Sequence, residues 1–159
     1  SESPRIGKEC SLSDILEDNP DQKYFLSEKA TATLMREIKK GRTGLPIQSQ
    51  EDMPARARED GNGQPVIIDT RQITREITPR FYEEAPTLNA TMHKEPYKVM
   101  DNMKIRRLTP IECERLQGFP DNWTKYGADG ELISDTQRYK MCGNAVTTNV
   151  ITAIAEKLL

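Results

Sequence analysis

The chain has 159 residues, of which 35% are hydrophobic and 30% charged, and its mean hydropathy is −0.73. This length fits one domain, or a larger and a smaller lobe, and the low apolar content predicts a thin core with long loops. The 23 basic and 25 acidic residues leave a formal net charge of −2, which excludes a global field that would recruit nucleic acid or an acidic membrane. Local cations and backbone amides can still hold phosphates, so a nucleic-acid partner is neither required nor excluded.

Apolar runs, cysteines and histidines indicate the compartment of a protein and its capacity to bind metal. No apolar run approaches the roughly 18 to 20 residues of a membrane helix, and the first residues lack the apolar segment of a signal peptide. The three cysteines, Cys10, Cys113 and Cys142, are too widely spaced for a zinc knuckle, and the lone His93 has no partner at metal-ligand spacing. The sequence predicts a soluble, cytoplasmic chain with no membrane partner and no metal site.

The first forty residues predict two short helices. Ser11 is a candidate N-cap for a helix whose apolar face starts at Leu12. Residues 33–40 place Leu34 and Ile38 one turn apart, directly before a glycine that would end the helix.

The middle of the chain predicts a loop followed by short strands. Residues 41–65 are polar, rich in Gly, Pro, Gln, Arg and Asp, and have no sustained periodicity, which is typical of a loop. Residues 66–68 (VII) form a candidate buried strand, and Ile73 and Ile77 lie in β-branched surroundings that favour short strands or extended arms.

Residues 107–123 carry a clear helix start. Thr109 is a good N-cap, Pro110 belongs at the first helical position, and Glu112 falls at the third position, where it completes a capping box. Gly118 is placed to end this helix. A last helix is predicted over about residues 145–158, because apolar side chains there form a stripe at helical spacing. The stripe consists of Val146, Val150, Ile151, Ile154 and Leu158.

Two stretches carry more information than periodicity explains. Residues 107–123 (RLTPIECERLQGFPDNW) and 139–146 (YKMCGNAV) resemble motifs IX and X of the DNA cytosine-5 methyltransferases, in the order and approximate spacing of that family. Residues 85–90 (APTLNA) resemble the Thr-Leu dipeptide near the end of the family's target-recognition region, and residues 11–26 are similar to the chain just after motif VIII.

The family's catalytic motifs do not occur in this sequence. Its Pro-Cys dipeptide, its Glu-Asn-Val and its Phe-x-Gly-x-Gly cofactor loop are all missing, so no residue here is assigned as catalytic. The resemblance implies an α/β fold: the C-terminal part of an S-adenosylmethionine-dependent methyltransferase fold, with a small irregular β-containing target-recognition lobe. It implies that residues 1–18 end the methyltransferase core, 19–104 form the recognition region, and 105–159 return to the core.

The resemblance also implies a cofactor contact in the motif X stretch. Asn144, Ala145 and Val146 would line the S-adenosyl-L-methionine pocket, and Gly143 would permit close backbone approach. Asn144 could instead serve only as the N-cap of the final helix. At Ala145 a hydroxyl contact is impossible, so only the backbone amide could serve there.

Double-stranded DNA is the implied substrate of the recognition region. Thr87 is a candidate for a phosphate or flipped-nucleotide contact, with the alternative that it merely starts a strand whose Leu88 enters the core. Arginines of the variable region could reach guanine edges or phosphates, although each alone is more often a solvated surface residue. They are Arg80, Arg75, Arg71, Arg58 and Arg56.

The remaining motif residues are interpreted as framework. This set consists of Arg107, Thr109, Glu112, Arg115, Gly118 and Gly143. Phe119 and Trp123 are expected to be core anchors of the turn after the motif IX helix, because aromatic residues dominate burial in a chain so poor in them. Cys113 and Cys142 are expected to be structural rather than nucleophilic.

The sequence thus favours a C-terminal fragment or subunit of a DNA (cytosine-5)-methyltransferase that is not active alone. The catalytic cysteine and glutamate would come from an N-terminal half, in the same or a separate chain. The alternatives are a stand-alone DNA-binding module, whose affinity would fall steeply with salt, and an inactive remnant without methyl transfer. The same resemblance is compatible with a role in restriction-modification, in phage-borne protection or in regulation.

Overall fold

The structure is a computed structural model that describes residues 11–39, 65–69, 80–82, 85–101 and 104–158. The chain divides into two compact units, here called the helical unit (1–19, 86–96 and 109–159) and the sheet unit (20–85 and 97–108). The expected functional division into residues 1–18, 19–104 and 105–159 is not tested by these units. Which function each unit serves stays a prediction.

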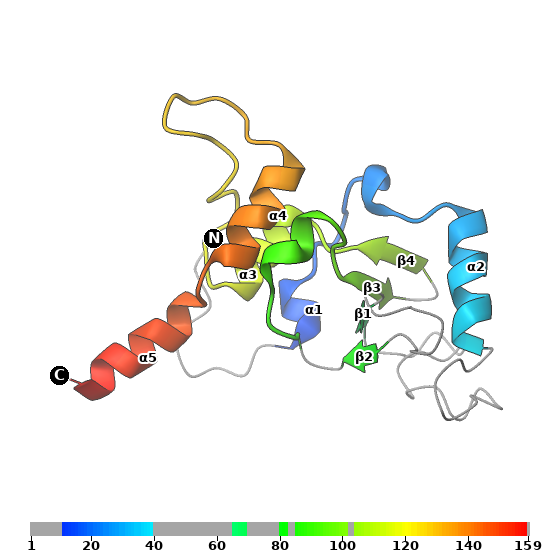
Figure 1. The fold of residues 1–159 in the computed structure, drawn as a ribbon, viewed down its shortest axis with the longest axis horizontal. Helices are drawn as coiled ribbons and strands as arrows, with labels where there is room; N and C mark the ends of the chain where they lie inside the picture. Colours follow the sequence, from blue (N-terminus) through cyan, green and yellow to red (C-terminus); the bar gives the residue numbers. More distant parts are fainter. Residues whose placement is uncertain (1–10, 40–64, 70–79, 83–84, 102–103, 159) are drawn as a thin grey trace. The chain divides into compact units, whose positions relative to one another are not determined.

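An antiparallel sheet of four strands, in the order β2-β1-β3-β4, organises the sheet unit (Figure 1). The strands are β1 Val66–Asp69, β2 Arg80–Tyr82, β3 Lys98–Asp101 and β4 Lys104–Arg107. The strand predicted at residues 66–68 is confirmed as β1. Apart from Pro65, the loop predicted at residues 41–65 lies outside the described residues, as do Ile73 and Ile77.

The core of the sheet unit lies between the sheet and helix α2 (Glu28–Lys39), which follows the short 3-10 helix η1 (Gln22–Tyr24) (Figure 1). Its apolar side chains come from Ile68, Met100 and Ile105 of the sheet and from Leu26, Leu34 and Met35. Helix α2 starts earlier than the predicted residue 33, because Ser27 caps it: the Ser27 hydroxyl accepts the Ala30 N–H at 3.3 Å and its carbonyl accepts the Thr31 N–H at 2.8 Å.

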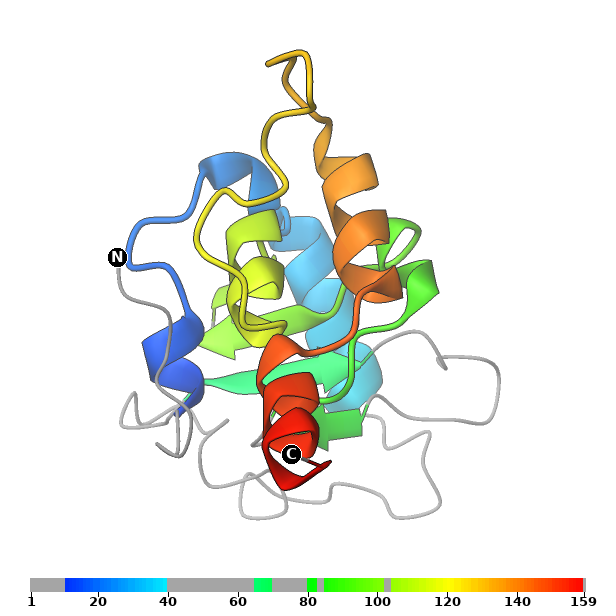
Figure 2. The same cartoon turned by 90° about the vertical axis from the view of Figure 1, so that its left-hand side faces the viewer.

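The helices in the described part of the helical unit are short. They are α1 (Leu12–Ile15), the 3-10 helix η4 (Ala90–His93), α3 (Pro110–Leu116), α4 (Asp135–Asn144) and α5 (Thr148–Leu158). Helix α4 lies alongside η4 in both views (Figures 1 and 2) and also packs against α3. Helix α4 buries Arg138, Tyr139 and Cys142, whereas no residue of α5 is buried.

The prediction of one final helix over residues 145–158 is wrong at its start. Helix α4 ends at Asn144, Ala145 adopts an extended conformation (φ −75°, ψ 162°), and α5 begins only at Thr148. Helix α4 itself escaped prediction because its sequence is polar, although Ser134 caps its start by accepting the Gln137 N–H. Asn144 is therefore the last residue of α4 and not an N-cap, and Gly143 lies inside the same helix.

The combination of helices with a small sheet agrees with the expected mixed α/β class. Among the described residues, no helix has the length and apolar character needed to cross a membrane. Within the same part of the chain, no group of His, Cys, Asp and Glu side chains is placed to hold a metal ion.

Candidate functional site

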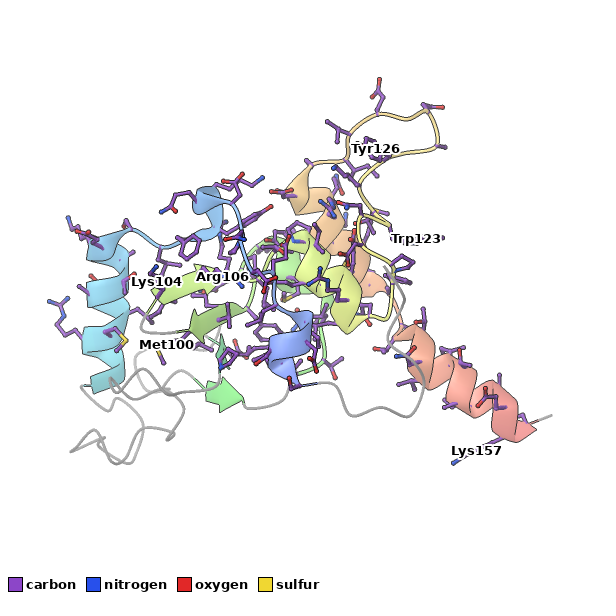
Figure 3. All side chains as sticks on the ribbon, turned by 180° about the vertical axis from the view of Figure 1, so that it is seen from behind. Met100, Lys104, Arg106, Trp123, Tyr126 and Lys157 are labelled. Carbon is purple, nitrogen blue, oxygen red and sulfur yellow. The ribbon has the colours of Figure 1, made fainter. Side chains whose placement is uncertain are left out.

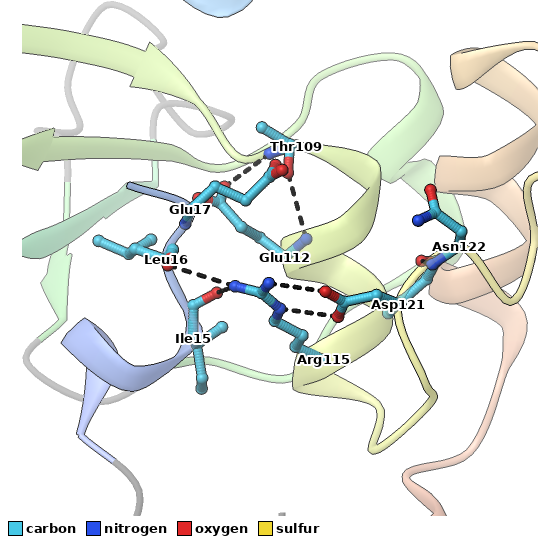
Figure 4. Close-up of polar contacts among 9 residues, drawn as sticks. Ile15, Leu16, Glu17, Thr109, Glu112, Arg115, Asp121 and Asn122 are labelled. Carbon is cyan, nitrogen blue, oxygen red and sulfur yellow. Dashed lines mark hydrogen bonds and ion pairs between the residues drawn. The ribbon is translucent and has the colours of Figure 1, made fainter. Parts of the chain in front are cut away.

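The start of α3 is held by the capping box that its sequence predicts. The Thr109 N–H donates to Glu112 Oε2 at 2.7 Å, and the Glu112 N–H donates to Thr109 Oγ1 at 3.2 Å (Figure 4). Both carboxylate oxygens of the buried Glu112 are used, because Oε1 accepts the Glu17 N–H at 2.9 Å. The Thr109 hydroxyl in turn donates to the Glu17 carboxylate. The capping box thus also binds the chain just after α1.

Arg115 adds a second connection between α3 and α1. Its Nε and Nη2 donate to the two carboxylate oxygens of Asp121 at 2.8 and 2.7 Å, and its Nη1 donates to the carbonyls of Ile15 and Leu16 at 2.8 and 3.3 Å (Figure 4). Because this hydrogen-bonded pair favours both charged forms, it raises the pKa of Arg115 and lowers the pKa of Asp121. Arg115 thus joins α3 to the end of α1 and to Asp121, and its framework role in a complete enzyme stays a prediction.

Glu114 is the centre of a buried polar cluster that joins α3 to α4. Its carboxylate is fully buried and forms an ion pair with Arg138 Nη2 at 2.9 Å. It also accepts the N–H groups of Asn122 at 2.7 Å and Thr124 at 2.9 Å, together with the Thr124 hydroxyl. This arrangement fixes the turn after α3, in which Asn122 has a positive φ of 64°.

The prediction that Trp123 is a core anchor is wrong. The Trp123 side chain is 64% exposed and stacks on Phe119, with ring centroids 6.4 Å apart. Figure 3 shows Trp123 and Tyr126 on the connection between α3 and α4. The turn does not need an aromatic anchor, because the buried Glu114 carboxylate already binds the backbone on both sides of Trp123.

Helix α3 ends in a Schellman motif at Gly118, which has a φ of 76°. The Gly118 N–H donates to the Arg115 carbonyl at 3.0 Å, and the Phe119 N–H donates to the Glu114 carbonyl at 2.9 Å. A Cβ at Gly118 would lie 3.2 Å from Asn149 Oδ1 and closer still to Thr148 Oγ1. Gly118 therefore ends the helix and also makes room for the start of α5.

Gln117 binds the connection between α4 and α5. Its side chain is buried, with Nε2 donating to the Cys142 carbonyl and Oε1 accepting the Thr147 hydroxyl, each at 2.8 Å. Its backbone carbonyl accepts the Thr148 N–H at 2.9 Å. The segment of residues 144–146, the candidate cofactor contact, lies between these anchor points.

Two of the three candidate cofactor residues present side chains to the surface. Asn144 is exposed at the end of α4, and Val146 is 61% exposed. The Ala145 N–H, however, donates to the carbonyls of Met141 at 3.0 Å and Cys142 at 3.3 Å, so this amide is already used to end α4. Gly143 packs against the backbone of Asn89. A Cβ at Gly143 would lie 2.7 Å from the Asn89 carbonyl carbon and closer to the carbonyl oxygen.

The candidate DNA contacts fall in both units. Thr87 is exposed just before η4, in the helical unit, and the following Leu88 is buried. Arg80 begins β2 in the sheet unit, and its backbone lies opposite that of Asp69 in β1. Arg107, which is expected to be a framework residue and not a DNA contact, is exposed on β4 and donates to the Lys23 carbonyl at 3.2 Å. The other arginines expected to contact DNA, Arg75, Arg71, Arg58 and Arg56, lie outside the described residues.

The cysteines of the motif stretches are poorly suited to nucleophilic attack. Cys113 and Cys142 are free thiols with no exposed surface. Burial raises the pKa of Cys113 well above its ordinary value and that of Cys142 to about 11. Because the thiolate is the nucleophile, both groups are protonated and unreactive at neutral pH.

Three residues of this site, Glu114, Gln117 and Arg138, were missed by sequence reasoning. Glu114 and Gln117 lie within the motif IX stretch at helical spacing, so two polar residues on one face could have indicated a buried network. For Arg138 no local signal exists, because its partner Glu114 is distant in the sequence.

Buried polar side chains thus join the short helices of the two motif stretches. The family model for C-5 cytosine-specific DNA methylase matches residues 2–159. The chain therefore belongs to the C-5 cytosine-specific DNA methylase family.

Individual relatives match along most of this chain. It is 31% identical over 153 residues to the type II methyltransferase M.NlaX of Neisseria lactamica, covering 96% of this chain and 40% of that protein. It is 31% identical over 150 residues to the type II methyltransferase M.DsaV of Dactylococcopsis salina, covering 94% and 35%. The orphan methyltransferase M.SPBetaI of Bacillus phage SPbeta is 30% identical over 191 residues, with 93% and 42% covered. The chain thus spans about two fifths of the length of these relatives or less.

Proposed function

We propose that this chain is the C-terminal part of a DNA (cytosine-5)-methyltransferase, which recognises double-stranded DNA and closes the S-adenosyl-L-methionine pocket. In this proposal the catalytic cysteine and glutamate come from an N-terminal half, in the same or a separate chain. Family membership supports the reaction, and the partial coverage of the relatives supports the division of labour. The neutral, buried state of Cys113 and Cys142 supports a nucleophile that lies elsewhere.

The observation that carries the proposal is the exposed apolar face of α5. None of its residues is buried, although its large side chains form a stripe at helical spacing. The exposed apolar residues at and just before α5 are Val146, Val150, Ile151, Ile154 and Leu158. A contiguous apolar face of this kind marks an interaction surface, and we assign it to the methyltransferase core of the N-terminal half.

S-adenosyl-L-methionine, the methyl donor of the family, fits the described residues in part. Asn144 offers both an amide donor and an acceptor at the surface, and Val146 offers apolar area. Because Asn144 ends α4, the helix dipole there favours a cationic group, such as the ammonium or sulfonium of this cofactor. When bound, the cofactor supplies an electrophilic methyl group. The contribution of Ala145 is limited to its shape, since its N–H ends α4.

DNA contact is assigned to Thr87 and Arg80, together with Arg75 and Arg71. A threonine hydroxyl can donate to a phosphate oxygen, and a guanidinium matches O6 and N7 of guanine in the major groove. The exposure of Thr87 supports this assignment.

Association through α5 gives the experiment that tests this proposal. Ile154→Asp should weaken binding to a complementary half, carrying the Pro-Cys, Glu-Asn-Val and glycine-loop motifs, by about tenfold or more, because a carboxylate would be buried without a partner. Glu156→Lys, on the opposite side of α5, is the matched control and should change the affinity less than twofold. Titration calorimetry measures the affinity of each variant for the complementary half. Equal affinities for Ile154→Asp and the wild type would remove the assigned role of α5.

A further inference from the structure

We infer that Gln117 is a positioning residue for cofactor binding, acting through the segment of residues 144–146. This inference rests on the proposed function, in which that segment contacts S-adenosyl-L-methionine. Gln117 lies at the end of the motif IX helix and is not one of the candidate cofactor contacts. Its carboxamide donates to Cys142 of the motif X stretch and accepts from Thr147, the residue just after that stretch.

The geometry places one buried carboxamide between the two ends of the segment. Gln117 is only 3% exposed. Its Nε2 donates to the Cys142 carbonyl, two residues before Asn144, and its Oε1 accepts the hydroxyl of Thr147, one residue after Val146, both at 2.8 Å. The two flanks of residues 144–146 are thus held by a single side chain.

The segment needs this support because helical hydrogen bonds hold only its start. Helix α4 ends at Asn144, and α5 begins at Thr148. Ala145 is extended, and its N–H completes the end of α4. Ordering a loop on ligand binding weakens affinity, so fixing both flanks beforehand strengthens the binding of any ligand that contacts the segment.

Glutamine is suited to this role because it carries a donor and an acceptor on one planar group. Glutamate at this position would keep an acceptor for Thr147 but lose the donor to the Cys142 carbonyl. Leucine would remove the hydrogen bonds to both the Cys142 carbonyl and the Thr147 hydroxyl. The carbonyl of Gln117 reinforces the same connection by accepting from the Thr148 N–H at 2.9 Å and the Thr148 hydroxyl at 3.2 Å.

Thr147→Val tests the inference with little risk to folding, since it removes only one hydroxyl from a half-buried side chain. In the mixture with the complementary half, we expect the KM and Kd for S-adenosyl-L-methionine to rise about three- to tenfold, the effect of one lost hydrogen bond. The kcat and the Kd for DNA should stay within about twofold. Thr147→Ser, which restores the hydroxyl, should return the cofactor affinity to the wild-type value.

Thr152→Val is the matched control. Its hydroxyl donates to the Thr148 carbonyl at 3.1 Å, in the same helix, but does not reach Gln117. It should leave the cofactor Kd unchanged. Gln117→Glu should raise the cofactor Kd by an amount similar to Thr147→Val.

Amide hydrogen exchange supplies a readout that does not depend on activity. Exchange at residues 144–147 should be about threefold to tenfold faster in Thr147→Val than in the wild type or Thr152→Val. An unchanged exchange rate, or faster exchange with unchanged cofactor affinity, would overturn the inference. A wild-type mixture that binds no S-adenosyl-L-methionine would instead contradict the proposed function, and the exchange rates would then show separately whether Gln117 orders the segment.

Discussion

Glu114→Ala should lower the free energy of unfolding of the chain by about 3–5 kcal/mol. The substitution leaves the buried guanidinium of Arg138 without its carboxylate partner. It also removes the acceptor for the N–H groups of Asn122 and Thr124, of which the Thr124 side chain is buried. Removing this carboxylate costs more than an average mutation, because the buried donors of Arg138 and Thr124 lose their shared acceptor.

Urea unfolding followed by circular dichroism measures the free energy of unfolding. Glu131→Ala, an exposed carboxylate on the same connection between α3 and α4, is the matched control and should change stability by less than about 0.5 kcal/mol. Combining Glu114→Ala with Arg138→Met should recover part of the loss, because no buried charge then stays unpaired. A loss below about 1 kcal/mol for Glu114→Ala would show that the cluster is not buried as described.

Gly143→Ala should also destabilise the chain, by about 2–3 kcal/mol. The added Cβ would lie 2.7 Å from the Asn89 carbonyl carbon and closer to its oxygen, and backbone atoms cannot move aside as a flexible side chain can. Helix propensity acts in the opposite direction, since alanine inside a helix is about 1 kcal/mol more favourable than glycine. The sign of the measured change therefore decides between close packing on η4 and local propensity.

Gly127→Ala is the control for this substitution. Its Cβ would lie 3.8 Å from the Glu131 carbonyl oxygen, which is ordinary van der Waals contact, so stability should change by less than about 0.5 kcal/mol. Thermal or urea unfolding of both variants and the wild type measures these changes in stability. A Gly143→Ala variant as stable as the wild type would mean that α4 does not approach Asn89 so closely.

The elements that sequence reasoning predicted well are those with local signals. The capping box at Thr109 and Glu112 consists of neighbouring residues, and the Ser11 cap of α1 is equally local. The strand β1 follows from an uninterrupted apolar run. In each case the residues that form the element also carry the sequence pattern that predicts it, so a single sequence is enough for the prediction.

The errors have non-local causes. Helix α4 is mostly polar, and its burial depends on Arg138 meeting Glu114 from another helix. The exposure of Trp123 follows from the same cluster, because Glu114 binds the turn that an aromatic anchor was expected to hold. The break at Ala145 involves Gln117, which no pattern within residues 139–158 could indicate. Propensity and periodicity cannot predict these long-range hydrogen bonds.

The same contacts give α3 a consistent supporting role. Through Glu112 and Arg115 it binds the end of α1, through Glu114 it binds the following turn and α4, and through Gln117 it binds the connection to α5. The framework role expected for the motif IX stretch stays a prediction about the complete enzyme, but the described contacts supply a physical basis for it.

Transfer of labelled methyl from S-adenosyl-L-methionine to mixed-sequence duplex DNA tests the central claim most directly. It would be measured for the chain alone, for a complementary half with the Pro-Cys, Glu-Asn-Val and glycine-loop motifs, and for the mixture. The proposed division of labour predicts transfer only in the mixture. Transfer by the chain alone would contradict it, because a nucleophile would then have to lie among residues that we assign no catalytic role; no transfer in any sample would favour a binding module or an inactive remnant.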